Sequence, residues 1–341
     1  MPQSAALTTA LASLEEIDSE PQAAAMARGL LVGYDARWQS QHSGSVPMKV
    51  VEIEKTYQAP LLHTSHKAMR RSRTFTLAGK IDKLVDWDGL TLIDHKTTAA
   101  QIEDPAATYW RQLQIDGQPM HYAILLAQNG IRLKRIVWDV IRKPAIRPKQ
   151  LPAAAAGRLR DSGLYCGQWI TPKAFPETIH EADFLELYEA RVIEAVTEKP
   201  ESYFQRRTIN YTDADIIEYN GTLWDLAQDL LSTRRHNRHY CNPGACMTFG
   251  VPCTYLPICS KVDTPDGEAW QQRPAVHVEL DAVKDSANAL TNSRIKTYQT
   301  CRRKHFYRYE LGIEKHSEDE SEALKFGSLF HALLDHYWSK I

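Results

Sequence analysis

The chain has 341 residues, 43% of them hydrophobic, and its 41 basic side chains nearly balance 42 acidic ones. A chain of this size and composition can bury one large core or two ordinary ones. The net charge of −1 excludes a polycation, so any contact with nucleic acid must come from local basic patches. No apolar run reaches the ~18 residues of a membrane-spanning helix. Residues 1–22 lack the basic start of a secretory signal, so we expect a cytoplasmic protein.

Helices and strands alternate in the predictions for the first 236 residues. Residues 1–43 are rich in Ala and Leu and predict helix, and residues 48–62 predict a strand. Residues 74–98 predict a β-hairpin with the turn Asp-Trp-Asp-Gly, in which Gly89 can adopt a positive φ. Further along, we expect a helix at 109–130, a strand at 131–144, and helices at 176–200 and 221–236.

The last third of the chain changes character twice. Residues 260–290 carry Pro, Gly, Asp and Lys without periodicity and predict a linker. Residues 291–341 regain order, with an apolar helical stripe of Phe326, Phe330, Leu333 and Leu334. We therefore expect a core at 1–259, a linker at 260–290, and a segment at 291–341 that packs back on the core.

The predicted hairpin carries charges where a half-buried strand should be apolar. Side chains two apart share a face of a strand, so Asp94 and Lys96 share one, and the hairpin brings Asp82 close to them. Buried charge is costly unless it is paired or binds a metal. Two neighbouring carboxylates suit a hard divalent cation, and a lysine beside them can activate a water or offset charge on a phosphate. Ordinary solvated surface charges are the alternative.

These residues resemble the motifs of the PD-(D/E)xK nuclease superfamily, in its RecB-like branch with phage-type iron–sulfur exonucleases. Gly-Lys-Ile-Asp is similar to the second motif, with Asp82 as a metal ligand. Asp-His-Lys is similar to the D/E-x-K motif, with Asp94 as a ligand and Lys96 as the catalytic lysine. Gln118 and Tyr122 resemble the Q-x3-Y motif and share a helical face; packing in the core is their alternative role.

The resemblance implies a restriction-endonuclease-like α/β core. Its central mixed β-sheet is expected to carry the site at one edge, to have helices on both sides, and to be accompanied by a cysteine-rich metal-cluster region.

The order of the motifs differs from the usual one. The family places a cysteine-bearing helix and a G-x3-H helix before the hairpin, whereas here Cys301 and then Gly327 with His331 follow it. The resemblance implies that His331 binds the same metal as Asp82 and Asp94, with the backbone carbonyl of His95 as a further ligand.

This rotated order predicts a circular permutation, because chain termini often lie close together and one fold can be cut elsewhere. His331 should then lie beside the hairpin of its own chain, and Met1 near Ile341. A truncated second copy that serves a neighbouring molecule by domain swapping is the alternative.

Four of the six cysteines fall within residues 241–259. In a reducing compartment such clustering favours a metal over disulfides. The resemblance implies a [4Fe–4S] cluster held by Cys246, Cys253, Cys259 and Cys301. A tetrahedral Zn²⁺ on Cys241, Cys246, Cys253 and Cys259 is the alternative. Cys166 is expected to be a buried thiol.

Two basic stretches favour contact with DNA, although solvated charges would explain either one alone. One contains Arg70, Arg71 and Arg73, and the other sets Arg302, Arg303 and Lys304 among aromatic residues.

The resemblance implies an Mg²⁺- or Mn²⁺-dependent deoxyribonuclease, an exonuclease on single-stranded ends, with a recombination protein or helicase as a partner. Phage or bacterial recombination, repair and CRISPR adaptation stay open as pathways. A metal-stabilised DNA-binding subunit without cleavage is the alternative function, but such a module needs no lysine beside two carboxylates.

Overall fold

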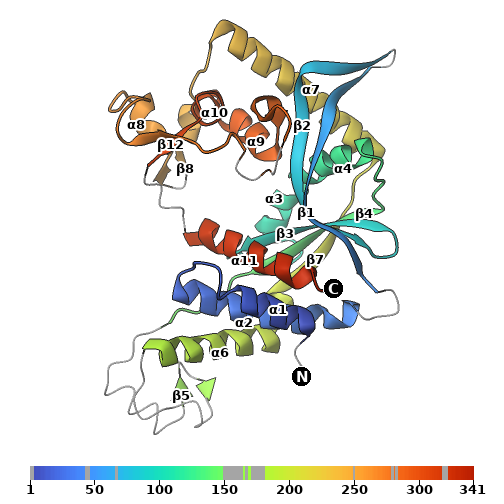
Figure 1. Ribbon diagram of the computed structural model, residues 1–341, viewed down its shortest axis with the longest axis vertical. Helices are drawn as coiled ribbons and strands as arrows, with labels where there is room; N and C mark the ends of the chain where they lie inside the picture. The colour runs from blue at the N-terminus through green and yellow to red at the C-terminus, as the bar shows by residue number, and fades with distance from the viewer. Residues whose placement is uncertain are drawn as a thin grey trace.

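The computed structural model describes residues 4–42, 47–65, 68–148, 164–165, 168–169, 181–248, 250–277, 280, 283–316 and 322–341. A six-stranded mixed sheet forms the centre of this part of the chain, and helices cover both of its faces (Figure 1). The predicted α/β class with a mixed central sheet is therefore confirmed. In the described ranges, every helix is too short or too polar to cross a membrane.

The sheet is built around a long antiparallel pair. Its main path runs β1 (Lys49–Ser65), β2 (Ala68–Asp86), β3 (Leu90–Thr98), β4 (Arg135–Arg142) and β7 (Phe204–Ile209). Neighbours on this path are antiparallel except β3 and β4, and the short β11 (Ala289–Leu290) joins β2 in parallel. The predicted hairpin of β2 and β3 is confirmed, and Gly89 in its turn has φ +99°.

One face of the sheet is covered by helices from both ends of the chain and from its middle. These are α1 (Ala5–Ser13), α2 (Pro21–His42), α6 (Glu181–Glu198) and α11 (Glu322–Trp338), which share one hydrophobic cluster with that face. The predicted stripe on α11 is buried in this cluster. Helices α2 and α6 approach closely, because a Cβ at Gly29 would lie only 2.6 Å from Val192 Cγ1.

The opposite face is covered by α4 (Gln118–Gln128), α7 (Asp213–His236) and α9 (Asn292–Thr300), beside the shorter α3 (Thr108–Gln114). The single helix expected at 109–130 is wrong, because the chain bends between α3 and α4. Asp116 Oδ1 accepts a hydrogen bond from the Gln118 N–H at 2.9 Å and so starts α4 afresh. At the bend, a Cβ on Gly117 would lie 2.5 Å from the Tyr219 ring.

Helix α7 begins earlier than expected, because Thr212 and Asp215 form a capping box.

A small lobe at residues 239–277 and 301–316 contains the cysteines at 241, 246, 253, 259 and 301, and we call it the cysteine lobe. Its elements are short: β8 (Met247–Thr248), β9 (Val251–Pro252), α8 (Leu256–Cys259), β10 (Trp270–Gln272), α10 (Arg302–His305), the π-helical turn Phe306–Glu310 and β12 (Ile313–Lys315). The remaining short elements of the chain are β5 (Leu164–Tyr165), β6 (Gln168–Trp169) and 3₁₀ turns at Pro200–Ser202, Pro243–Ala245 and Ser286–Asn288.

The segment 260–290, expected to be a linker, contributes to the fold. Strand β10 pairs with β12, β11 pairs with β2, and Trp270 is buried. This segment therefore connects the cysteine lobe to the sheet. The division into core, linker and closing segment stays a prediction.

Candidate active site

The candidate site lies where β2 loses its neighbour on one side. Strand β3 pairs with β2 from Lys83 to Asp86, and β11 pairs with it at Thr76 and Leu77. Since β1 lies along the other side of β2, residues 78–82 form a gap between β3 and β11. Helix α4 fills part of this gap: the Tyr122 hydroxyl donates to the Lys80 carbonyl at 2.8 Å. Asp82 and Asp94 therefore lie on β2 and β3, which are inner strands of the sheet. This differs from our expectation that the site would lie at an edge of the sheet.

Asp82 stands at the point where β2 and β3 separate. Its Oδ2 accepts a hydrogen bond from the His95 N–H at 2.7 Å and so joins the two strands beyond their last paired residues. Burial raises the pKa of Asp82 to about 6, although the positive charge of Lys96 acts against this shift. The carboxyl group therefore titrates nearer to neutral pH than an exposed aspartate does.

Asp94 and Lys96 lie side by side on β3, as predicted. They form an ion pair, and Asp94 is 1% exposed. Burial raises the pKa of Asp94 to about 7, and the charge of Asp82 also contributes to the rise. Gln118 on α4 contacts both residues, donating to Asp94 Oδ1 at 3.1 Å and accepting from Lys96 Nζ at 3.2 Å. The Asp-x-Lys pair is thus held in one arrangement from the side of α4.

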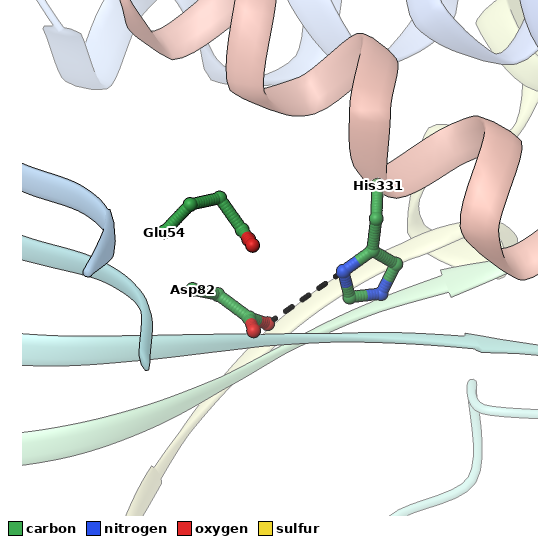
Figure 2. Close-up of side chains that lie close together, drawn as sticks. All are labelled: Glu54, Asp82 and His331. Carbon is green, nitrogen blue, oxygen red and sulfur yellow. Dashed lines mark ion pairs between the residues drawn. The ribbon is translucent and has the colours of Figure 1, made fainter. Parts of the chain in front are cut away.

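Helix α11 brings His331 to the same place, so the two sequence-distant halves of the predicted site meet within one chain. His331 Nδ1 lies 3.9 Å from Asp82 Oδ2, and Figure 2 shows the imidazole above the strands. Burial lowers the pKa of His331, which favours the neutral form that binds metals. A Cβ at Gly327 would lie 3.4 Å from Thr97 Oγ1, so α11 passes close to β3 at this glycine.

Two acidic residues at the site were missed by the sequence analysis. Glu54 of β1 faces Asp82 across the strand pair, and one ligand atom each of Glu54, Asp82 and His331 lie within 4.8 Å of one another (Figure 2). Asp335, one turn after His331 on α11, hydrogen-bonds to Glu54, and burial raises its pKa to about 8. The i, i+4 spacing from His331 could have indicated Asp335. Glu54 has φ +48°, which no local pattern in its strand predicts.

The donor set is chemically suited to a hard divalent cation. Carboxylate oxygens are the ligands that Mg²⁺ prefers, and a neutral imidazole is acceptable to Mn²⁺. Burial, and then the charge of neighbouring carboxylates, raises the pKa of Asp82, Asp94 and Asp335, so a cation among them would offset a real cost. The residues Glu54, Asp82 and His331 therefore fit such an ion, and Asp94 lies beside them in its ion pair with Lys96.

The second residue of the predicted Q-x3-Y pair also faces the site. The Tyr122 hydroxyl accepts from Gln118 Nε2 at 2.9 Å while it donates to the Lys80 carbonyl. His121, its neighbour, has its Nε2 at 3.0 Å from the Ala78 carbonyl in the same gap. Tyr122 thus orients Gln118. It also hydrogen-bonds a β2 backbone carbonyl that would otherwise need a neighbouring strand as its partner.

In the cysteine lobe, thiols distant in sequence gather around one place. Burial, and then the thiols of Cys253, Cys241 and Cys301, raise the pKa of Cys246. The Asn242 N–H donates to Cys301 Sγ at 3.4 Å, and the Cys253 N–H donates to the Cys246 carbonyl at 2.8 Å. The fifth thiol, Cys259, packs with Cys253 against the lobe's small apolar cluster. Cys166 lies outside the described residues.

The two basic stretches lie on different elements. Arg70, Arg71 and Arg73 are exposed on the arm that β1 and β2 form beyond the sheet. Arg302 instead pairs with Asp229 and lies over the Tyr240 ring, and the Arg303 Nε donates to the His239 carbonyl at 2.7 Å. Lys304 is half-buried beside them. Arg302 and Arg303 thus also hold the cysteine lobe in place.

A mixed sheet that opens around carboxylates, a lysine and a histidine has the groups that a metal-dependent hydrolase site would need. The model of the PD-(D/E)XK nuclease superfamily matches residues 3–260 and 289–340. The chain therefore belongs to the PD-(D/E)XK nuclease superfamily, as its motifs had indicated. Comparisons with curated proteins and with solved structures found no match. The RecB-like branch, the roles of the site residues and the circular permutation stay predictions.

Proposed function

We propose that this protein is a metal-dependent nuclease that cleaves DNA, and that it acts as an exonuclease on single-stranded ends. One observation carries the proposal: Glu54, Asp82 and His331 converge from three different elements beside the Asp94–Lys96 pair. Superfamily membership supports the class of reaction. The exonuclease mode rests on the resemblance to the RecB-like branch.

His331, Asp82 and Asp94 would hold one Mg²⁺ or Mn²⁺, with Glu54 and the carbonyl of His95 as further ligands. Such an ion, when bound, polarises the phosphate and lowers the pKa of a coordinated water. The Lys96 ammonium, fixed by Asp94 and Gln118, can orient the attacking water and offset charge that develops on the phosphate. Tyr122 keeps Gln118 in the position that this task requires.

The DNA would lie along basic surface on either side of the site. Arg70, Arg71 and Arg73 on the β1–β2 arm offer exposed charges for phosphates. On the other side, Arg302, Arg303 and Lys304 belong to a lobe that also presents the half-exposed ring of Tyr240, on which a base can stack. Recombination or repair in a phage or a bacterium is the context that we propose, with a recombination protein or helicase as partner.

We also propose a [4Fe–4S] cluster on Cys246, Cys253, Cys259 and Cys301 in the cysteine lobe. The set rests on the resemblance, and the influence of Cys253, Cys301 and Cys241 on the pKa of both Cys246 and Cys259 indicates that these thiols lie near one another. A tetrahedral Zn²⁺ on Cys241, Cys246, Cys253 and Cys259 stays the alternative occupant of the lobe.

The rotated motif order is explained, on this proposal, by circular permutation. His331 Nδ1 lies 3.9 Å from Asp82 Oδ2 of the same chain, which is the arrangement that a permuted monomer requires. Helix α1, the first described helix, packs against α11, the last one, in a shared hydrophobic cluster (Figure 1). Met1 itself lies outside the described residues.

The proposal is tested by anaerobic purification followed by incubation with labelled DNA and Mg²⁺ or Mn²⁺. We expect linear single-stranded DNA to be degraded and circular single-stranded DNA to be spared. Cutting of the circle would replace the exonuclease mode with an endonuclease mode. Tight DNA binding without any cleavage, with either metal, would overturn the nuclease function in favour of a binding subunit.

A further inference from the structure

A buried charged cluster lies behind the candidate site, and sequence motifs gave no sign of it. It consists of Tyr34 on α2, Asp139 on β4 and Arg206 on β7, and we call it the Asp139 cluster. Asp139 Oδ2 accepts from the Tyr34 hydroxyl at 2.5 Å and from Arg206 Nε at 3.1 Å. Arg206 Nη2 donates to the Tyr34 hydroxyl at 2.9 Å. Asp139 is fully buried, and the Arg206 side chain is 5% exposed.

His95 connects this cluster to the candidate site. It is paired with Asp139 in the register of β3 and β4, and its Nδ1 lies 3.4 Å from Asp139 Oδ2. The same residue gives its N–H to Asp82, and its ring stands perpendicular to that of His331 with 6.1 Å between centroids. His95 therefore touches the Asp139 cluster with its side chain and the site with its backbone.

The cost of burying Asp139 suggests that it does more than fill space. Val137 and Ile141, two residues before and after it on the same face of β4, are buried in the apolar core. An apolar side chain would thus suit the local pattern, and replacing a buried ion pair by apolar residues is often neutral or stabilising. A charged residue at this position fits a role in placing its polar neighbour, His95.

We propose that the Asp139 cluster positions the metal-binding stretch of β3 through the ring of His95. When the ring is fixed, the peptide groups on either side of His95 are fixed too, and with them the Asp82 contact and the directions of Asp94 and Lys96. Asp139, Arg206 and Tyr34 are thus positioning residues. The inference rests on the proposed metal-dependent function. Outer partners of this kind typically change metal affinity 10- to 100-fold.

The test measures Mn²⁺ affinity of the full chain by calorimetry, without any DNA. Asp139→Asn keeps the shape of the side chain and removes its charge, and we expect Mn²⁺ to bind about 10- to 100-fold more weakly. Tyr34→Phe removes one hydroxyl from the cluster and should weaken binding in the same direction by less. If Asp139→Asn does not fold, the Mn²⁺ affinity of Tyr34→Phe tests the inference instead. Wild-type affinity in whichever of these variants folds would overturn the inference.

Asp35→Asn is the matched control. Asp35 is also a buried carboxylate on α2, but its partners are the hydroxyls of Ser4 and Tyr337 and not a residue of the site. We expect this variant to lose stability while its Mn²⁺ affinity stays within about twofold of wild type. An equal loss of affinity in this control would overturn the inference, because the effect would then be general.

A double variant with His95→Ala distinguishes positioning through His95 from a general loss of structure. In His95→Ala protein, the link to the site is already broken, so adding Asp139→Asn should change Mn²⁺ affinity less than about twofold. A full additional loss in the double variant would show that Asp139 acts by another route and would overturn the inference. If the wild-type protein itself neither binds Mn²⁺ nor cleaves DNA, the proposed function fails, and this inference fails with it.

Discussion

The candidate site and the cysteine lobe are the two regions for which we propose a bound metal, but the surrounding structure supports them very differently. The site is held by strands of a six-stranded sheet and by α4 and α11, between two extensive hydrophobic clusters. The cysteine lobe has strands of two or three residues and an apolar cluster of five buried residues.

This difference in the surrounding core predicts that the fold of the candidate site and the fold of the cysteine lobe depend differently on a bound metal. A site formed by a large core keeps its geometry without an ion and gives its ligands perturbed pKa values instead. The lobe buries little apolar surface of its own, so on our proposal metal binding contributes to its folding. The predictions below test this contrast, from the largest expected effect to the smallest.

Removal of the site lysine should have the largest effect. Lys96→Ala should lower the rate of DNA cleavage about 10²- to 10⁴-fold, which is typical of losing a group that assists proton transfer or stabilises charge. DNA affinity should change little, because the basic surfaces remain. The control is Lys134→Ala, since Lys134 is exposed at the far end of the hairpin, where it pairs with Asp88. Cleavage at the wild-type rate in Lys96→Ala would refute the assignment.

Loss of a cluster ligand should unfold the cysteine lobe and leave the sheet intact. Cys301→Ser should bleach the visible absorbance of anaerobically purified protein and expose residues 239–277 and 301–316 to limited proteolysis. Cys241→Ser should keep both the colour and the resistance to protease. Elemental analysis that finds zinc and no iron, with Cys241→Ser as damaging as Cys253→Ser, would instead establish the zinc site.

Glu54 offers an intermediate test of the site. Glu54→Gln should weaken Mn²⁺ binding about tenfold, as expected when one carboxylate partner of a metal site loses its charge. Glu52→Gln, two residues earlier on β1, is the control, because Glu52 pairs with Lys55 and Tyr57 and not with the site. The measurement is the Mn²⁺ affinity of both variants by calorimetry. If Glu54→Gln binds Mn²⁺ as tightly as Glu52→Gln does, Glu54 is not a ligand.

The pH dependence of metal binding should reflect the raised pKa values of Asp82 and Asp94, about 6 and 7. Below these values the carboxyls hold protons that Mn²⁺ must displace, so affinity should rise with pH between about 5 and 8 and then level off. Calorimetry at pH 6 in two buffers of different ionisation enthalpy should show proton release, which is smaller at pH 8.5. Affinity that is flat from pH 5 to 8 would contradict the shifts.

The same shifts predict how the metal-free protein responds to pH. The folded-state pKa of Asp94 lies above its unfolded value, so its protonated form favours the folded state. This contribution to the free energy of unfolding is complete below about pH 4 and is lost as pH rises through about 7. Thermal unfolding of wild-type and Asp94→Asn protein between pH 5 and 8 should show a steeper decline in the wild type.

Much of the fold and part of the site could be predicted from local patterns. The hairpin follows from alternating apolar residues around a turn with Gly89, and the α11 stripe follows from helical periodicity. Asp82, Asp94 and Lys96 were recognisable because charges in an apolar strand are unusual.

Features that depend on residues far apart in sequence could not be predicted. The bend between α3 and α4 depends on the fit of Gly117 against Tyr219 of α7. Glu54 needs a backbone turn within β1, and the Asp139 cluster needs three elements to meet behind His95.

The most direct test of the central claim is pulsed electron paramagnetic resonance of the Mn²⁺-loaded protein. The claim is that α11 and the β2–β3 hairpin of one chain hold a single divalent cation. It predicts coupling of Mn²⁺ to a histidine nitrogen that disappears in His331→Gln and persists in His336→Gln, a change at an exposed histidine of the same helix. Coupling that survives His331→Gln, or bound Mn²⁺ with no nitrogen coupling in the wild type, would contradict the claim.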